Sequence, residues 1–169
     1  LQPTDQLLGT VIGSDNESIG SQINMFRFVV SDKGTTDSKS TRITTLRLIP
    51  GPENTAAWET AVQTVSIAEN STKIATDSCI VHNSEILIYP TNLEISDASE
   101  VELTMAVLLN NITNDGEKLQ FQITATEHGF TANKTGSTFA ENFAENINSD
   151  VFVLDVVADR LAFSSDLPE

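Results

Sequence analysis

An alternation of apolar and polar residues with a period of two limits the possible fold more than any other feature of this chain. The apolar residues of one such segment would share a single face of an extended strand: Val101, Leu103, Met105, Val107 and Leu109. Successive side chains of a β-strand point to opposite sides, so the pattern indicates strands with one buried face. The chain is therefore predicted to be all-β, with two packed layers.

A second alternating run follows this segment after a polar loop. Leu119, Phe121 and Ile123 alternate with polar residues, and the loop between the two runs ends in Asp115-Gly116. Asp-Gly is a common turn sequence between paired strands. Strands at 101–109 and 119–123 are therefore predicted to pair as a hairpin.

The earlier part of the chain contains two further strands. Phe26, Phe28 and Val30 alternate, whereas Ile23 and Met25 fall on the opposite parity, which predicts a β-bulge near Met25. A β-branched strand is predicted from Thr41 to Ile49, and the Pro-Gly-Pro sequence that begins at Pro50 ends it.

One short helix is predicted over residues 54–62, with Asn54 or Thr55 as its cap and Trp58 plugging one end of the sandwich. Short strands follow up to Tyr89, and a final strand begins after Asp150 and changes parity at Asp159-Arg160. The predicted fold is an antiparallel β-sandwich, Ig-like or jelly-roll-like, with about ten strands and one helix.

The length of the chain fits a single domain. The 169 residues are assigned to one sandwich, 1–164, and to a linker, 165–169, that leads to a following module. No stretch approaches the roughly 20 apolar residues that a membrane helix needs, so direct membrane insertion is not expected. We expect an isolated domain of this kind to be a monomer.

The net charge of −15 is strongly acidic, with 24 Asp and Glu against 9 Lys and Arg. Such a surface repels the phosphates of nucleic acids and anionic membranes, so neither is an expected partner. High negative charge serves solubility in many proteins, and it also attracts cations.

Catalytic signatures are absent from the sequence: it has no phosphate-binding glycine loop, no nucleophile elbow and no zinc-binding helix motif. His82, Cys79 and Asp77 would follow one another on one strand, where they cannot converge as a triad must. His128 is distant in sequence, and Cys79 is interpreted as a buried apolar residue. The chain is therefore predicted not to be an enzyme.

Calcium is the main ligand hypothesis. The loop that begins at Asp32 contains a second carboxylate at Asp37 together with hydroxyl and carbonyl oxygens. Calcium binds six to eight oxygen ligands, and loops between strands supply them. The alternative, which we favour, is a solvated turn, because Asp, Gly and Ser dominate turns in general. No other cofactor is predicted.

Carbohydrate binding is a separate hypothesis, because sugar-binding modules stack sugars on exposed aromatic side chains. Aromatic residues make up only 6% of this chain. A glycan-binding module would have to expose Trp58 or Tyr89 on a flat or grooved face. An accessory domain of a secreted enzyme is a third, weaker alternative.

The order of the motifs resembles that of large β-sandwich repeats in secreted, surface-displayed proteins of Bacteroidetes-type bacteria. The features that carry this resemblance are the Met25–Asp32 strand, Ser40–Ile43, Trp58, the Val101–Leu109 strand, the Asn114–Gly116 turn, Leu119–Ile123, Gly136–Phe139 and Val157–Phe163. The resemblance implies an extracellular or cell-surface location and a structural or adhesive role. It also implies neighbouring modules of the same parent chain as partners, and a glycan or a cell-surface protein as a possible ligand.

Overall fold

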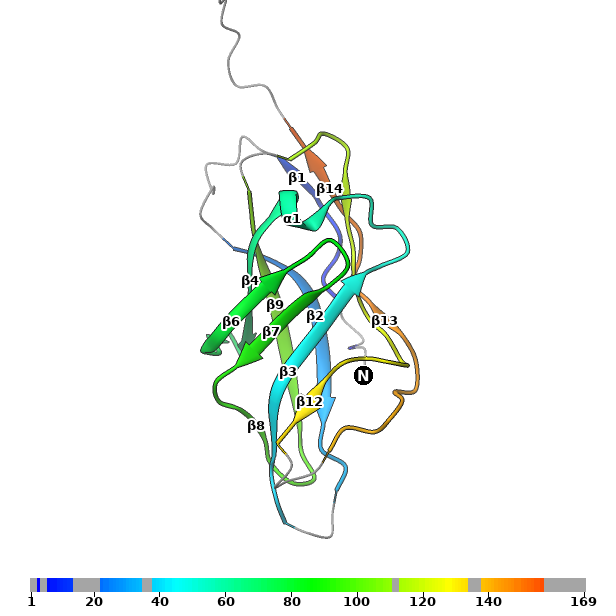
Figure 1. Ribbon diagram of the computed structural model, residues 1–169. Helices are drawn as coiled ribbons and strands as arrows, with labels where there is room; N and C mark the ends of the chain where they lie inside the picture. Colours follow the sequence, from blue (N-terminus) through cyan, green and yellow to red (C-terminus); the bar gives the residue numbers. More distant parts are fainter. Residues whose placement is uncertain are drawn as a thin grey trace, which may run out of the picture.

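The computed structural model describes residues 3, 6–13, 22–34, 38–110, 113–133 and 138–156. The predicted linker at 165–169 and the parity change at Asp159-Arg160 lie outside the described residues. The fold is all-β with one short helix, and its strands form two packed layers and a smaller third sheet (Figure 1). The predicted sandwich class is therefore confirmed.

One layer consists of four antiparallel strands. In spatial order they are β2 (Ile23–Ser31), β9 (Glu100–Leu109), β4 (Val62–Glu69) and β5 (Thr72–Lys73). The long β9 pairs with β2 along one edge and with β4 along the other. Its alternating side chains Leu103, Met105 and Val107 are completely buried, as the period of two predicted.

The second layer is centred on β3 (Thr41–Pro50), which crosses the first layer in Figure 1. The two halves of β3 have different neighbours. The first half pairs with β8 (Leu93–Ile95) and β12 (Thr131–Ala132), and the second half pairs with β7 (Ile86–Pro90) and β11 (Phe121–Ile123). Two further strands extend this layer: β6 (Thr76–Val81) beside β7, and β13 (Ile147–Asn148) beside β11.

A smaller sheet joins the first and last described strands of the chain. In it, β14 (Phe152–Asp155) lies between β1 (Val11–Gly13) and β10 (Lys118–Leu119). The pairing of β10 with β14 is antiparallel, whereas β1 runs parallel to β14. Among the strand pairs of the described residues, β1 and β14 form the one parallel pair.

The core lies between the two layers. Its largest completely or almost completely buried side chains are Trp58, Phe26, Phe28, Phe121 and Phe152. Full burial of one large apolar side chain stabilises a fold by about 1.5–3 kcal/mol. The core therefore rests on the residues that the alternation marked, supplemented by Trp58 from the helix.

The bulge predicted near Met25 is present. The register between β2 and β9 shifts between Asn24 and Phe26. Both Met25 and Phe26 are 0% exposed, although neighbouring strand residues normally point to opposite faces. The extra residue of the bulge resolves the conflict of parity that the sequence contains.

The helix is shorter than predicted. It forms a single turn, α1 (Trp58–Ala61), and Ala57 occupies the position of its N-cap without a side-chain hydrogen bond. The predicted caps are therefore wrong. Asn54 instead accepts a hydrogen bond from the indole Nε1 of Trp58 at 2.8 Å, and Thr55 Oγ1 accepts one from the Lys118 amide.

The predicted hairpin between 101–109 and 119–123 is also wrong. The partners of β9 are β2 and β4, whereas β11 pairs with β3 and β13 in the other layer. The chain therefore crosses between layers after β9. Leu119, Phe121 and Ile123 are buried as predicted, because parity fixes which face is buried and is the same whichever layer a strand joins.

The described residues form fourteen strands rather than about ten. The excess comes from four short strands that were not predicted, β1, β8, β12 and β13, and from the predicted 119–123 strand, which is split into β10 and β11. The edge strand β2 carries an additional polar contact: the side-chain amide of Gln6 donates to the carbonyl of Arg27 at 2.8 Å and accepts from its N–H at 2.9 Å. The amide of Gln6 thus takes the place of a neighbouring main chain at this position.

Candidate functional site

Asp32, the first predicted calcium ligand, follows β2 directly and is only 7% exposed. Its Oδ2 accepts a hydrogen bond from Thr41 Oγ1 at 2.5 Å, and its Oδ1 accepts one from the Gly34 N–H at 2.9 Å. Its own N–H donates to the carbonyl of Ser99 at 2.8 Å. The carboxylate therefore ties the end of β2 to the start of β3. The second predicted ligand, Asp37, lies outside the described residues.

Asp32 also lines the rim of a cavity of about 530 Å³ between the layers. The volume falls in the range of small-ligand pockets. Apolar side chains from both layers line most of it: Phe28, Val30, Ile95, Ile123, Phe130, Phe139, Phe143 and Ile147. Polar side chains are fewer and include Lys33, Thr41, Thr138, Asn142 and Glu145. This cavity is the principal candidate site for a ligand.

An aromatic cluster beside the cavity is organised around His128. The imidazole stacks on Phe143, with ring centroids 3.9 Å apart and planes inclined by 15°. Phe130 and Phe139 contact this pair edge-on. Phe130, Phe139 and Phe143 thus form one wall of the cavity. Among the described residues of the 128–143 segment, β12 is the one strand.

The hydrogen bonds of His128 fix the position of its proton. The Phe130 N–H donates to Nδ1 at 3.0 Å, so Nδ1 carries a lone pair and the proton lies on Nε2, which donates to the carbonyl of Ala140 at 2.9 Å. Only 8% of the residue is exposed. Both nitrogens therefore hold the main chain in place, and neither is left to act as a base.

Sequence reasoning did not identify this cluster, because residues 124–146 show no regular period. The available signal was the recurrence of aromatic residues at Phe130, Phe139 and Phe143 in an otherwise polar stretch. Aromatic rings in a polar stretch of sequence are expected to pack on an apolar surface elsewhere in the fold. These three rings line the cavity between the layers.

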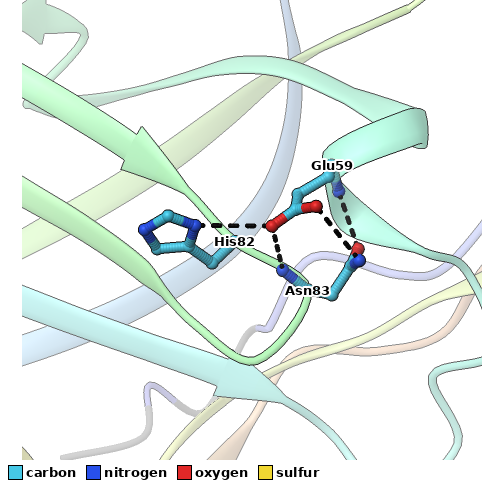
Figure 2. Close-up of polar contacts among 3 residues, drawn as sticks. All are labelled: Glu59, His82 and Asn83. Atoms are coloured by element: carbon cyan, nitrogen blue, oxygen red, sulfur yellow. Dashed lines mark hydrogen bonds and ion pairs between the residues drawn. The ribbon is translucent and has the colours of Figure 1, made fainter.

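His82 belongs to a different cluster, drawn in Figure 2. Its Nδ1 lies 3.4 Å from Glu59 Oε1. The side chain of Asn83 accepts from the Glu59 N–H at 3.0 Å, and its Nδ2 donates to Glu59 Oε2 at 3.3 Å. The cluster fastens α1 to the turn between β6 and β7. His82 and Glu59 are both more than half exposed, so the cluster forms no pocket around a substrate.

Asp77 and Cys79, the other two residues of the hypothetical triad with His82, have separate partners. Asp77 Oδ1 accepts a hydrogen bond from Thr91 Oγ1 at 3.1 Å. Burial raises the pKa of the Cys79 thiol, an effect that hydrogen bonds with the Val65 main chain and the Thr64 side chain partly oppose. The thiol therefore stays protonated and is a poor nucleophile. The structure does not bring His82, Cys79 and Asp77 into one site.

The two aromatic residues considered for glycan binding differ in accessibility. Trp58 is 0% exposed and stacks on Phe121, so no sugar can reach its face. Tyr89 is half-buried at the end of β7. The exposed platform that a glycan-binding module would need is therefore not provided by Trp58.

No group of three or more His, Cys, Asp or Glu side chains within the described part of the chain is arranged to hold a metal ion. Among the same residues, no helix is long and apolar enough to span a membrane. No family model matches the chain, and no curated protein or solved structure matches it.

Proposed function

We propose that this chain is a non-catalytic structural or adhesion module of a larger extracellular or cell-surface protein. The proposal rests on one observation: carboxylate and imidazole groups that could act in catalysis instead make hydrogen bonds that join elements of the fold. Asp32 joins β2 to β3, His128 holds the segment that walls the cavity, and Glu59 binds the β6–β7 turn. The proposed location rests on the resemblance of the motif order to that of bacterial surface repeats.

The test is to locate the parent protein and to delete this module from it. Antibodies against the 169-residue chain are applied to intact cells of the organism that encodes it, before and after the surface is digested with protease. We expect labelling that protease removes, and reduced attachment or altered surface architecture in the deletion strain. Labelling only after lysis, or turnover of a substrate by the purified chain, would overturn the proposal.

Glycan binding at the cavity is the second candidate function. Phe139 and Phe143 are partly buried aromatic rings, and polar side chains including Asn142 and Glu145 stand beside them. Aromatic faces next to hydrogen-bonding groups suit a sugar ring, which has apolar faces and a polar perimeter. These side chains support a candidate glycan site on the 138–147 segment rather than at Trp58.

A glycan array separates this candidate from the first one. We expect binding by a glycan-recognising module to be lost in Phe139→Ser and Asn142→Ala. Binding should be retained in Tyr89→Ala, which changes an aromatic residue that does not line the cavity. An array without signal for the unmodified chain would eliminate glycan recognition and leave the structural role.

A further inference from the structure

We infer that β1 and β14 form a mechanical clamp, which keeps the module folded when tension is applied along the chain. The inference rests on the proposed function, since tension reaches a module through the neighbours to which it is tethered. The observation behind it is the parallel pairing of Val11, Ile12 and Gly13 with Val153, Leu154 and Asp155 (Figure 1).

The direction of the two strands decides how a pulling force acts on their hydrogen bonds. In a parallel pair, the N-terminal end of β1 and the C-terminal end of β14 lie at opposite ends of the ladder. A force that separates the two chain ends therefore slides one strand past the other, and it loads all bonds of the ladder at once. An antiparallel terminal pair would be peeled apart one bond at a time.

Further contacts continue the attachment on the N-terminal side of β1. The carbonyl of Thr10 accepts a hydrogen bond from the Val153 N–H at 3.2 Å. The Gly9 N–H donates to Asp150 Oδ2 at 2.8 Å. Gln6 makes its two bonds to Arg27 of β2. A force applied at the N-terminus therefore acts on these contacts before it reaches the core residues.

The partner strand β14 is held firmly by the rest of the domain. Phe152 and Leu154 are each only 2% exposed. On the edge away from β1, the Leu154 N–H donates to the carbonyl of Glu117, and its carbonyl accepts from the Gly116 N–H, both at 2.8 Å. Pulling β14 out therefore requires buried apolar side chains to move together with the ladder.

The test is single-molecule force spectroscopy on the 169-residue chain, pulled in two directions. One variant, Asn114→Cys with Cys79→Ala, carries handles at both termini and at position 114. Residue 114 lies close to the C-terminal end of β14, since Asp115 Oδ1 accepts a hydrogen bond from the Val156 N–H at 3.0 Å. Pulling between residue 114 and the C-terminus therefore peels β14 away.

We expect the unfolding force between the two termini to be at least about twofold higher than the force between residue 114 and the C-terminus, since forced unfolding reports the barrier along the direction pulled. Equal forces in the two directions, or a lower force between the termini, would overturn the inference. Neither result depends on where the parent protein resides, so failure of the proposed function is distinguished by the labelling experiment.

A pair of neighbouring substitutions tests the clamp itself. A Cβ at Gly9 would stand 1.9 Å from the carbonyl oxygen of Val151, so Gly9→Ala pushes the segment before β1 away from the residue directly before β14. The matched control is Leu8→Ala, because Leu8 is 80% exposed. We expect Gly9→Ala alone to lower the force between the termini, and an unchanged force would overturn the inference. If Gly9→Ala fails to fold, the comparison of unfolding forces in the two pulling directions decides whether β1 and β14 form a clamp.

Discussion

The indole of Trp58 lies on the ring of Phe121, with centroids 5.0 Å apart and planes inclined by 30°. Its Nε1 donates to Asn54 Oδ1 at 2.8 Å, and the same oxygen accepts from the Gln120 N–H at 3.2 Å. The contact joins the single turn of α1 to β11 of the second layer. Trp58, which lies in the short connection between β3 and β4, is thereby part of the buried core.

Trp58→Ala is therefore expected to lower the free energy of unfolding by about 3–5 kcal/mol, the range for removing a buried aromatic side chain. Trp58→Phe keeps an aromatic ring on Phe121 but removes the Nε1 donor, and a smaller loss of about 1–2 kcal/mol is expected. Urea unfolding followed by far-UV circular dichroism measures both. A loss below about 1 kcal/mol for Trp58→Ala would contradict the complete burial of Trp58.

The calcium hypothesis makes a prediction about melting. Both carboxylate oxygens of Asp32 already accept hydrogen bonds from within the protein. We therefore expect the melting temperature to be unchanged by a chelator, whereas a bound structural ion would raise it. Asp32→Ala should cost about 1–3 kcal/mol with or without calcium, since Thr41 and the Gly34 N–H lose their acceptors. A chelator-dependent midpoint that Asp32→Ala abolishes would establish a calcium site.

Asp150 gives a prediction about pH. Hydrogen bonds from the Gly9 and Val151 N–H groups hold the pKa of its carboxyl below the ordinary value of 3.8. A lowered folded-state pKa stabilises the fold above the pKa of the unfolded state, and this contribution is lost as pH falls through the folded-state pKa. Asp150→Asn should therefore cost stability at neutral pH, by less than about 1 kcal/mol because the side chain is exposed.

Urea titrations measure the difference in the free energy of unfolding between Asp150→Asn and the unmodified chain. They are repeated at pH values from neutral to below 3.8. The two curves should converge in acid as the unmodified carboxyl becomes protonated. A difference that stays constant over the whole range would show that the carboxylate charge has no part in the effect.

The turn between β4 and β5 contains two residues in the left-handed region, Asn70 at φ 46° and Ser71 at φ 67°. Asparagine tolerates this conformation, whereas serine pays a steric cost that glycine avoids. Ser71→Gly should stabilise the protein by about 0.5 kcal/mol after the entropy of the unfolded glycine is subtracted. The control is Ser78→Gly in the exposed part of β6, which should destabilise it. Thermal unfolding of both variants checks the opposite signs.

Burial could be predicted from the sequence far better than strand pairing could. The period of two identified Leu103, Met105, Phe121 and Ile123 as core residues, because parity depends on the strand alone. Pairing depends on which loop crosses between layers, and no local pattern encodes that choice. The sequence of residues 110–117 suits a tight turn between paired strands. The next strand, β10, instead pairs with β14 in the smaller sheet, and β11 then pairs with β3 in the second layer.

The candidate site could be predicted only in part. Asp32 was singled out as a ligand because carboxylates in loops often bind cations, but a buried carboxylate also serves to join two strands through Thr41. Whether a carboxylate is free depends on neighbours that only the folded chain supplies. The cavity wall formed by Phe139 and Phe143 belongs to a segment without periodicity, where sequence reasoning has no rule to apply.

The side chain of Gln6, which binds both main-chain groups of Arg27, bears on aggregation. An open edge strand can recruit the strand of another molecule. The N–H and the carbonyl of Arg27 are already hydrogen-bonded to Gln6, so an incoming strand cannot pair continuously along β2. An incoming strand would therefore have to displace the Gln6 side chain before it could pair with β2 at Arg27.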